Sequence, residues 1–101
     1  MSLTVIANVY AKFGKVDIVK AELEKLADAT RRVEGCISYD MHQNHDNPAH
    51  FIFYENWENR ETWKSNMKAH HFDAYKKATD GSIEDFVVNE MSKISQKRKG
   101  A

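Results

Sequence analysis

Apolar and polar residues follow two different periods along this chain, and these periods predict strands and helices in turn. Residues 3–11, 36–43 and 50–57 are short runs rich in β-branched and aromatic side chains, which is typical of strands. The pattern of residues 83–94 predicts a fourth strand. Across residues 16–33 the apolar positions recur every three or four residues, as in an amphipathic helix.

A second helical region is predicted over residues 59–79, with Asn59 as its N-terminal cap. At about 100° per residue, Phe72 lies opposite the other apolar side chains of this region, which predicts a break near Ala69 and two short helices. The order strand, helix, strand, strand, helix, strand predicts an α+β, ferredoxin-like βαββαβ fold. In this fold both helical regions cover one face of an antiparallel sheet.

Several predicted strands are apolar on both faces. In residues 50–57, for example, Phe53 and Trp57 alternate with Ile52 and Tyr54. Two helical regions can cover only one face, and soluble monomers rarely expose a large apolar patch. The sequence therefore predicts a homodimer in which two sheets pack face to face.

Length and charge narrow the class of protein further. We expect one domain over residues 3–94 and a solvated basic tail over residues 95–101. Lysine plus arginine and aspartate plus glutamate balance at 15 each, so no charge excess favours nucleic acid or membrane lipid as a partner. The single cysteine, Cys36, excludes an internal disulfide, and no apolar run is long enough to span a bilayer. We expect a cytoplasmic protein.

Two adjacent histidines lie in the second helical region. His71 shares one helical arc with Trp63, Met67 and Tyr75, and His70 lies at its edge. We therefore expect His71 to face the sheet and His70 to be exposed to water. An imidazole that points into an aromatic cleft is a candidate general base near neutral pH, and the alternative is a buried histidine with a structural hydrogen bond.

Two polar residues interrupt apolar strands. Asn8 shares a strand face with Tyr10, and its amide either holds a substrate oxygen or bonds to a loop backbone. Glu55 lies between Phe53 and Trp57 on one face, and a buried carboxylate there needs a partner. We expect an arginine or lysine across the dimer to pair with Glu55, rather than a catalytic role.

Metal and nucleotide chemistry have little support. His42, His45 and His50 crowd one predicted hairpin, but they lack the spacing of a zinc site. No glycine-rich phosphate loop is present. We expect no metal ion.

The chain resembles the antibiotic biosynthesis monooxygenase family from about residue 3 to residue 94. The matching features are a Gly-Cys pair that opens the second strand, a Glu-x-Trp motif that closes the third, an aromatic in the following helix, and a histidine with a tyrosine four residues on. In this chain they are Gly35, Cys36, Glu55, Trp57, Trp63, His71 and Tyr75, and the first strand and the Gly14-Lys15 turn also fit.

This resemblance implies dimers whose two sheets form a shared α+β barrel, and members that oxidise quinol or phenolic molecules with O2, without metal or flavin. Other members isomerise small phosphorylated hydroxyketones, and haem-degrading relatives share the fold. Those relatives have a functional asparagine at a position like Asn8, and a haem-ligating histidine where this chain has Lys76. The lysine argues against haem.

The leading hypothesis is a homodimeric, cofactor-independent monooxygenase that acts on a quinol-like or polyphenolic molecule with O2. His71 is the expected base and Asn8 the expected partner of the substrate anion. Substrate contacts are expected from five further residues: Tyr10, Phe53, Trp63, Met67 and Tyr75. A non-catalytic dimeric binding protein and an isomerase of a phosphorylated hydroxyketone are the alternatives.

Overall fold

The computed structural model describes residues 2–95, and the rest of the predicted basic tail lies outside the described residues. Seven elements follow one another in the predicted order, with the second helical region divided in two. They are β1 (Leu3–Ala11), α1 (Val16–Thr30), β2 (Cys36–Gln43), β3 (His50–Trp57), α2 (Arg60–Met67), α3 (His70–Ala78) and β4 (Ile83–Met91). The first helix therefore ends three residues earlier than predicted, and the last strand also ends three residues earlier.

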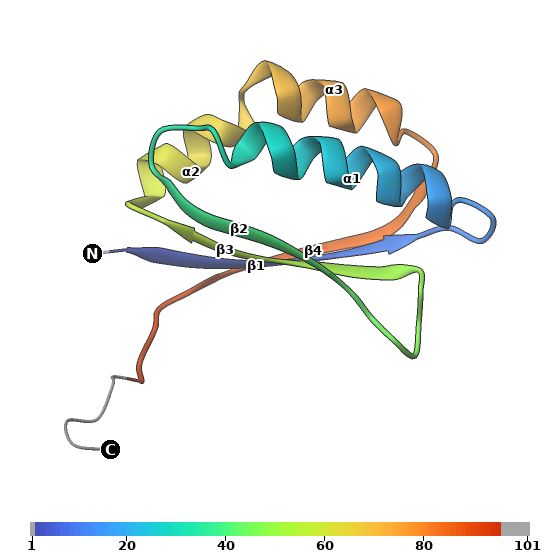
Figure 1. Cartoon of the computed structure of the whole chain (residues 1–101), viewed down its shortest axis with the longest axis horizontal. Coiled ribbons are helices and arrows are strands. Elements are labelled where there is room, and N and C mark those ends of the chain that lie inside the picture. Colours follow the sequence, from blue (N-terminus) through green and yellow to red (C-terminus); the bar gives the residue numbers. More distant parts are fainter. Residues whose placement is uncertain (1, 96–101) are drawn as a thin grey trace.

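The four strands form one antiparallel sheet in the order β2-β3-β1-β4. All three helices cover the same face of this sheet, so the molecule has a helical layer and a sheet layer (Figure 1). This arrangement confirms the predicted ferredoxin-like α+β fold.

The core lies between the two layers. Strand β1 turns Val5, Ala7 and Val9 toward the helices, and all three are buried. Helix α1 meets this face with Val19 and Leu23, which are fully buried because the apolar stripe of the helix points at the sheet.

The predicted break between two short helices is confirmed at Ala69. This residue has extended backbone angles (φ −75°, ψ 157°) and precedes the first turn of α3. The break changes which side chains point inward, and Phe72, expected on the far side, is half-buried and packs against the core.

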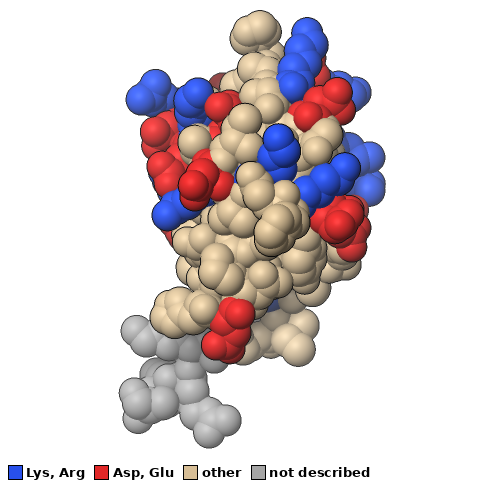
Figure 2. All heavy atoms as spheres, turned by 90° about the vertical axis from the view of Figure 1, so that its right-hand side faces the viewer, with Lys and Arg blue, Asp and Glu red and all other residues tan. Residues whose placement is uncertain are grey.

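No helix within residues 2–95 covers the other face of the sheet. Apolar side chains on this face include Tyr54 of β3 and Val87 and Met91 of β4, which are 42–44% exposed, and Ile52 of β3, which is half-buried. Seen end-on in Figure 2, charged side chains gather around the helical layer, and uncharged side chains dominate toward the sheet. The strands are therefore apolar on both faces, as the sequence predicts. No helix within residues 2–95 is long and apolar enough to cross a membrane.

Candidate functional site

A narrow cavity with a volume of about 30 Å³ lies between the helical layer and the sheet. Its wall is apolar except for a few polar atoms, and among the residues that the structure describes no lysine, arginine or histidine lines it. The polar atoms belong to five side chains: Tyr39, Glu55, Trp63, Asn66 and Tyr75.

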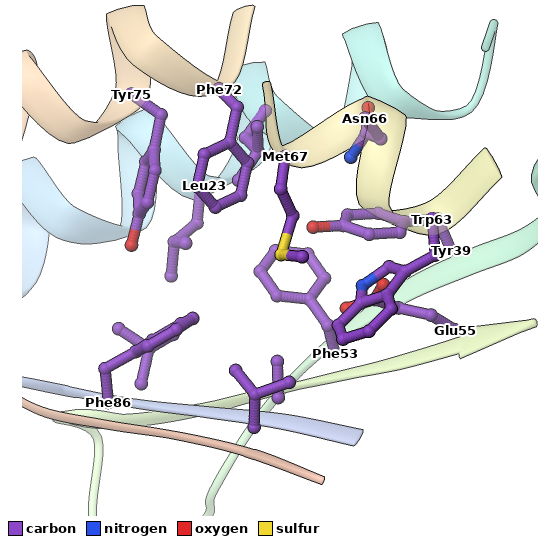
Figure 3. Close-up of a pocket in the computed structure, with 14 residues that line it drawn as sticks. Leu23, Tyr39, Phe53, Glu55, Trp63, Asn66, Met67, Phe72, Tyr75 and Phe86 are labelled. Carbon is purple, nitrogen blue, oxygen red and sulfur yellow. The ribbon is translucent and has the colours of Figure 1, made fainter. Parts of the chain in front are cut away.

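Four of the predicted substrate-binding residues line this cavity: Phe53, Trp63, Met67 and Tyr75. They come from β3, α2 and α3, and the break at Ala69 lets both short helices turn an aromatic side chain toward the sheet. Tyr75 and Phe86 lie at one end of the cavity, and Trp63 lies with Tyr39 and Glu55 at the other (Figure 3).

Asn8 and Tyr10 do not line the cavity. They lie on the opposite face of the sheet, because the buried positions of β1 are the odd-numbered ones. The Oδ1 atom of Asn8 accepts a hydrogen bond of 2.8 Å from Nε2 of His50, and the Tyr10 ring stacks on the His50 ring with centroids 4.3 Å apart. The structure thus separates these two residues from the aromatic cavity that they were expected to join.

His71 is half-buried, but it does not line the cavity either. It lies in a groove between α1 and α3, together with Glu22 and Lys25. Its Nε2 atom is 2.6 Å from Oδ1 of Asn66, a residue that does line the cavity. His71 therefore contacts the site through Asn66 and does not reach it directly. His70 is exposed, as expected.

Glu55 also lines the cavity, whereas the sequence led us to expect it to pair with a cation across a dimer. Its side chain points toward the helices and is 4% exposed, so it cannot pair with a cation across the uncovered sheet face. The partner within the chain is Trp57, whose Nε1–H donates a hydrogen bond of 2.9 Å to Oε1 of Glu55. The signal in the sequence was the carboxylate itself, between two buried aromatic residues of one strand face.

Burial controls the ionisation of this carboxyl group. Removing the carboxylate from water raises the pKa of Glu55 to about 7, and the hydrogen bond from Trp57 offsets only part of that increase. Near neutral pH Glu55 is therefore present in both forms. This is the property of a residue that can both accept and return a proton.

Two tyrosine hydroxyl groups add hydrogen-bond donors. Burial, and secondly the charge of Glu55, raise the pKa of Tyr39 well above its usual value of 10. Tyr39 lies directly opposite Glu55 in the pairing of β2 with β3. Burial also raises the pKa of Tyr75. Both phenols therefore remain protonated at neutral pH and can donate.

No metal-ligating group is found in the part of the chain that the structure describes: no three histidine, cysteine, aspartate or glutamate side chains gather there. The crowded histidines of the hairpin lie in other environments. His50 bonds to Asn8 and to Asn44 Nδ2 (3.1 Å), and His42 is exposed. Cys36 is half-buried, and burial raises the pKa of its thiol, which disfavours the reactive thiolate.

The fold defines a ferredoxin-like protein with a cavity between its helical layer and its sheet. The family model of antibiotic biosynthesis monooxygenases matches residues 2–78. The chain belongs to this family.

Solved structures share this fold. One described as an antibiotic biosynthesis monooxygenase is 28% identical, with a TM-score of 0.86 over 92% of this chain and 99% of that chain. A protein from Pseudomonas aeruginosa is 22% identical, with a TM-score of 0.89 over 93% and 95% of the two chains. A protein from Mycobacterium tuberculosis is 18% identical, with a TM-score of 0.86 over 95% and 98%. No curated protein matches the chain.

Proposed function

We propose that this protein is a cofactor-independent monooxygenase that oxidises a quinol-like or polyphenolic molecule with O2 in the cavity between sheet and helices. The observation that carries the proposal is one buried carboxyl group, with its pKa raised to about 7, in a cavity lined by aromatic side chains. An aromatic ring fits such a wall, and a phenol can give its proton to such a base.

The proposed reaction starts with proton transfer. Glu55, in its ionised form, removes a phenolic proton, and the resulting phenolate is electron-rich enough to reduce O2 by one electron. The phenoxyl radical, whose spin is shared by ring carbons, and superoxide combine into a C–O bond at a ring carbon and give a peroxide. Cleavage of the O–O bond with loss of the ring hydrogen then yields a quinone carbonyl, and Glu55 returns its proton as water leaves. One oxygen atom of O2 enters the product, the other becomes water, and the substrate supplies all four electrons.

The protein contributes desolvation, orientation and hydrogen bonds to the anion. Donors near the substrate oxygen come from Tyr39, Tyr75 and Asn66, which all line the cavity. Trp57 holds the carboxyl group of Glu55 in place through its indole N–H. In this assignment Glu55 is the base, and the earlier candidate, His71, acts outside the cavity.

The composition of the wall argues against a phosphorylated hydroxyketone. A phosphate group needs cationic or multiple backbone donors, whereas the charged group in this cavity is an acid. Arg31, near the end of the first helix, is exposed and donates instead to the backbone oxygen of Tyr39 and to Asp28.

The proposal includes a homodimer and a cytoplasmic location. The uncovered sheet face supports the homodimer, because it carries exposed apolar residues from two strands. A free cysteine fits the cytoplasmic location.

Oxygen consumption tests the function. Purified protein is incubated with a panel of quinols and polyphenols, and the product is analysed after reaction with isotopically labelled O2. We expect one labelled oxygen atom per product and no added metal or flavin requirement. Glu55→Gln should lower the rate about 100- to 10,000-fold, as for loss of a general base. Glu58→Gln, an exposed neighbour, is the matched control. Tight binding of the panel without oxygen uptake would identify a binding protein instead.

A further inference from the structure

One hydrogen bond connects the cavity with the groove on the outside of the helical layer. Asn66 belongs to the last turn of α2 and is 4% exposed, whereas His71 belongs to the first turn of α3 and is half-buried. The 2.6 Å contact between His71 Nε2 and Asn66 Oδ1 spans the break at Ala69. The two ends of the broken helix are therefore joined by a side-chain bond as well as by backbone bonds such as Ala69 N to Asn66 O (3.0 Å).

The chemistry of this contact determines which way the amide points. A carboxamide oxygen can only accept, so the Nε2 atom of His71 must carry the proton that it donates. With Oδ1 engaged in this way, the Nδ2 amino group of Asn66 lies on the cavity side, as Figure 3 shows. No partner for Nδ2 is found among the residues that the structure describes, so its two N–H groups are available to a ligand.

The geometry points to a positioning role for His71: from outside the cavity it fixes the Asn66 amide, so that Nδ2 donates to the oxygen of a bound phenolate. The inference deepens the proposed function and rests on it only for the class of ligand. It explains why a histidine that does not reach the cavity is bonded to a residue that does. It also gives the phenolate a donor on the helical layer, whereas the base Glu55 comes from the sheet.

The role predicts which replacements are tolerated. Glutamine at this position can still present an N–H near the place of Nε2, but it cannot act as a base. Leucine can do neither. A general-base histidine would lose its function in both variants, whereas a positioning histidine would lose it only in the second.

The protonation of His71 is testable without any ligand. Long-range ¹H–¹⁵N spectra of the wild-type protein at neutral and mildly alkaline pH report which ring nitrogen carries the proton. We expect a proton on Nε2 of His71. A neutral ring with the proton on Nδ1 alone would overturn the inference, because Nε2 could then only accept and the amide of Asn66 would be reversed.

Binding of a coloured phenol tests the role of the bond. Affinities of para-nitrophenol and of para-nitroanisole, which has no ionisable hydroxyl, are measured at neutral pH for the wild-type protein and three variants. We expect His71→Leu to weaken the phenol roughly 10- to 30-fold, since a hydrogen bond to a charged group is lost, and the anisole less than about threefold. His71→Gln should recover most of the phenol affinity. His70→Leu, at the exposed neighbour, is the control.

The outcomes separate this inference from the proposed function. Selective loss of phenol binding in His71→Leu, with recovery in His71→Gln, supports the positioning role even if no member of the panel is oxidised. Equal losses for phenol and anisole, or equal losses in both His71 variants, would overturn it even if the protein is an oxygenase. The circular dichroism spectrum of each variant shows that it is folded, and the spectra of the wild-type ring remain decisive if His71→Leu does not fold.

Discussion

Trp57 donates its indole N–H to the carboxyl group of Glu55, two residues earlier on the same strand, over 2.9 Å. Residues two apart on a strand share a face, so this bond is formed within β3 and needs no partner from another element. No partner for the second carboxyl oxygen of Glu55 is found among residues 2–95, and the Glu55 side chain lines the cavity. The strand thus holds an acid in place and still presents it to a ligand.

The first prediction concerns the stability cost of this acid. The unfolded chain has the ordinary glutamate pKa of 4.5, and the folded protein has about 7. Between these values the folded state binds more protons than the unfolded state, so stability falls as pH rises from about 4.5 to about 7 and stays level above. The shift corresponds to about 3 kcal/mol.

Glu55→Gln should remove this dependence. The amide oxygen can still accept from Trp57, but it never ionises. In urea unfolding, the variant should match the wild-type protein near pH 4.5 and be roughly 2–3 kcal/mol more stable above pH 7. Glu58→Gln, whose side chain is exposed, should show no such difference. A stability gain that does not depend on pH would contradict the raised pKa.

The second prediction concerns Gly35, which lies just before β2. Its φ of +92° is in the region that glycine favours, and a Cβ atom there would lie 2.6 Å from Cβ of Thr62. Gly35→Ala should therefore destabilise the protein by roughly 2–4 kcal/mol, from backbone strain plus this clash. Gly14 has a similar φ of +78°, but no atom lies within 4 Å of an added Cβ there. Gly14→Ala should therefore lower the stability by only about 1–2 kcal/mol. If thermal unfolding shows that both variants lose a similar amount of stability, the Thr62 contact does not matter.

The third prediction concerns Asn8, which remains a catalytic candidate from the sequence. Its bond to His50 lies on the face of the sheet away from the cavity. The Oδ1 atom of Asn44 accepts from the backbone N–H groups of Asp46 and Asn47, so its Nδ2 donates to Nδ1 of His50. Nε2 of His50 therefore carries the proton and donates to Asn8, which ties β1 to the β2–β3 hairpin.

Asn8→Ala should consequently cost about 1 kcal/mol of stability, as a lost hydrogen bond does. Turnover should change only a few-fold, because the amide is remote from the cavity within the chain. Asn66→Ala, at the cavity wall, should reduce turnover far more. A large rate loss in a folded Asn8→Ala variant would restore Asn8 to the reaction.

Much of the fold could be predicted from the sequence because each element has a clear period. The alternation in residues 36–43 and the stripe of residues 16–33 are local signals, and the structure has β2 and α1 there. The break at Ala69 was also predictable, because Phe72 did not fit a continuous helix. Which side chains of α3 point inward was not predictable, because an extended residue changes the rotation of the helix that follows it. This is why Phe72 lines the cavity and His71 does not.

The composition of the site was harder to predict, since it depends on which face of each strand meets the helices. Tyr10 and Phe53 both lie on strands with two apolar faces, and the sequence alone does not tell which of the two is covered. The register pairs Ala7 with Phe53 on the covered face and Tyr10 with His50 on the other. The role of Glu55 depended on the same choice of face, because a carboxylate on the uncovered face would have pointed away from the cavity.

The last prediction concerns the dimer and uses this knowledge of the faces. Val88, which pairs with Ala7, lies on the covered face and lines the cavity, so Val88→Asp would disturb the core and is no test of a sheet-to-sheet interface. Val87, which pairs with Asn8, lies on the uncovered face and is 42% exposed. If two sheets pack together, Val87→Asp buries an unpaired carboxylate in the interface, which is costly.

Ile18→Asp is the matched control, because Ile18 lies on α1 and is similarly exposed, at 46%. Sedimentation equilibrium at micromolar concentration should give twice the chain mass of 11.7 kDa for the wild-type protein and for Ile18→Asp, and a shift toward 11.7 kDa for Val87→Asp. A wild-type protein that sediments at 11.7 kDa, or a Val87→Asp variant that stays fully dimeric, would mean that the uncovered face is not the contact between two chains.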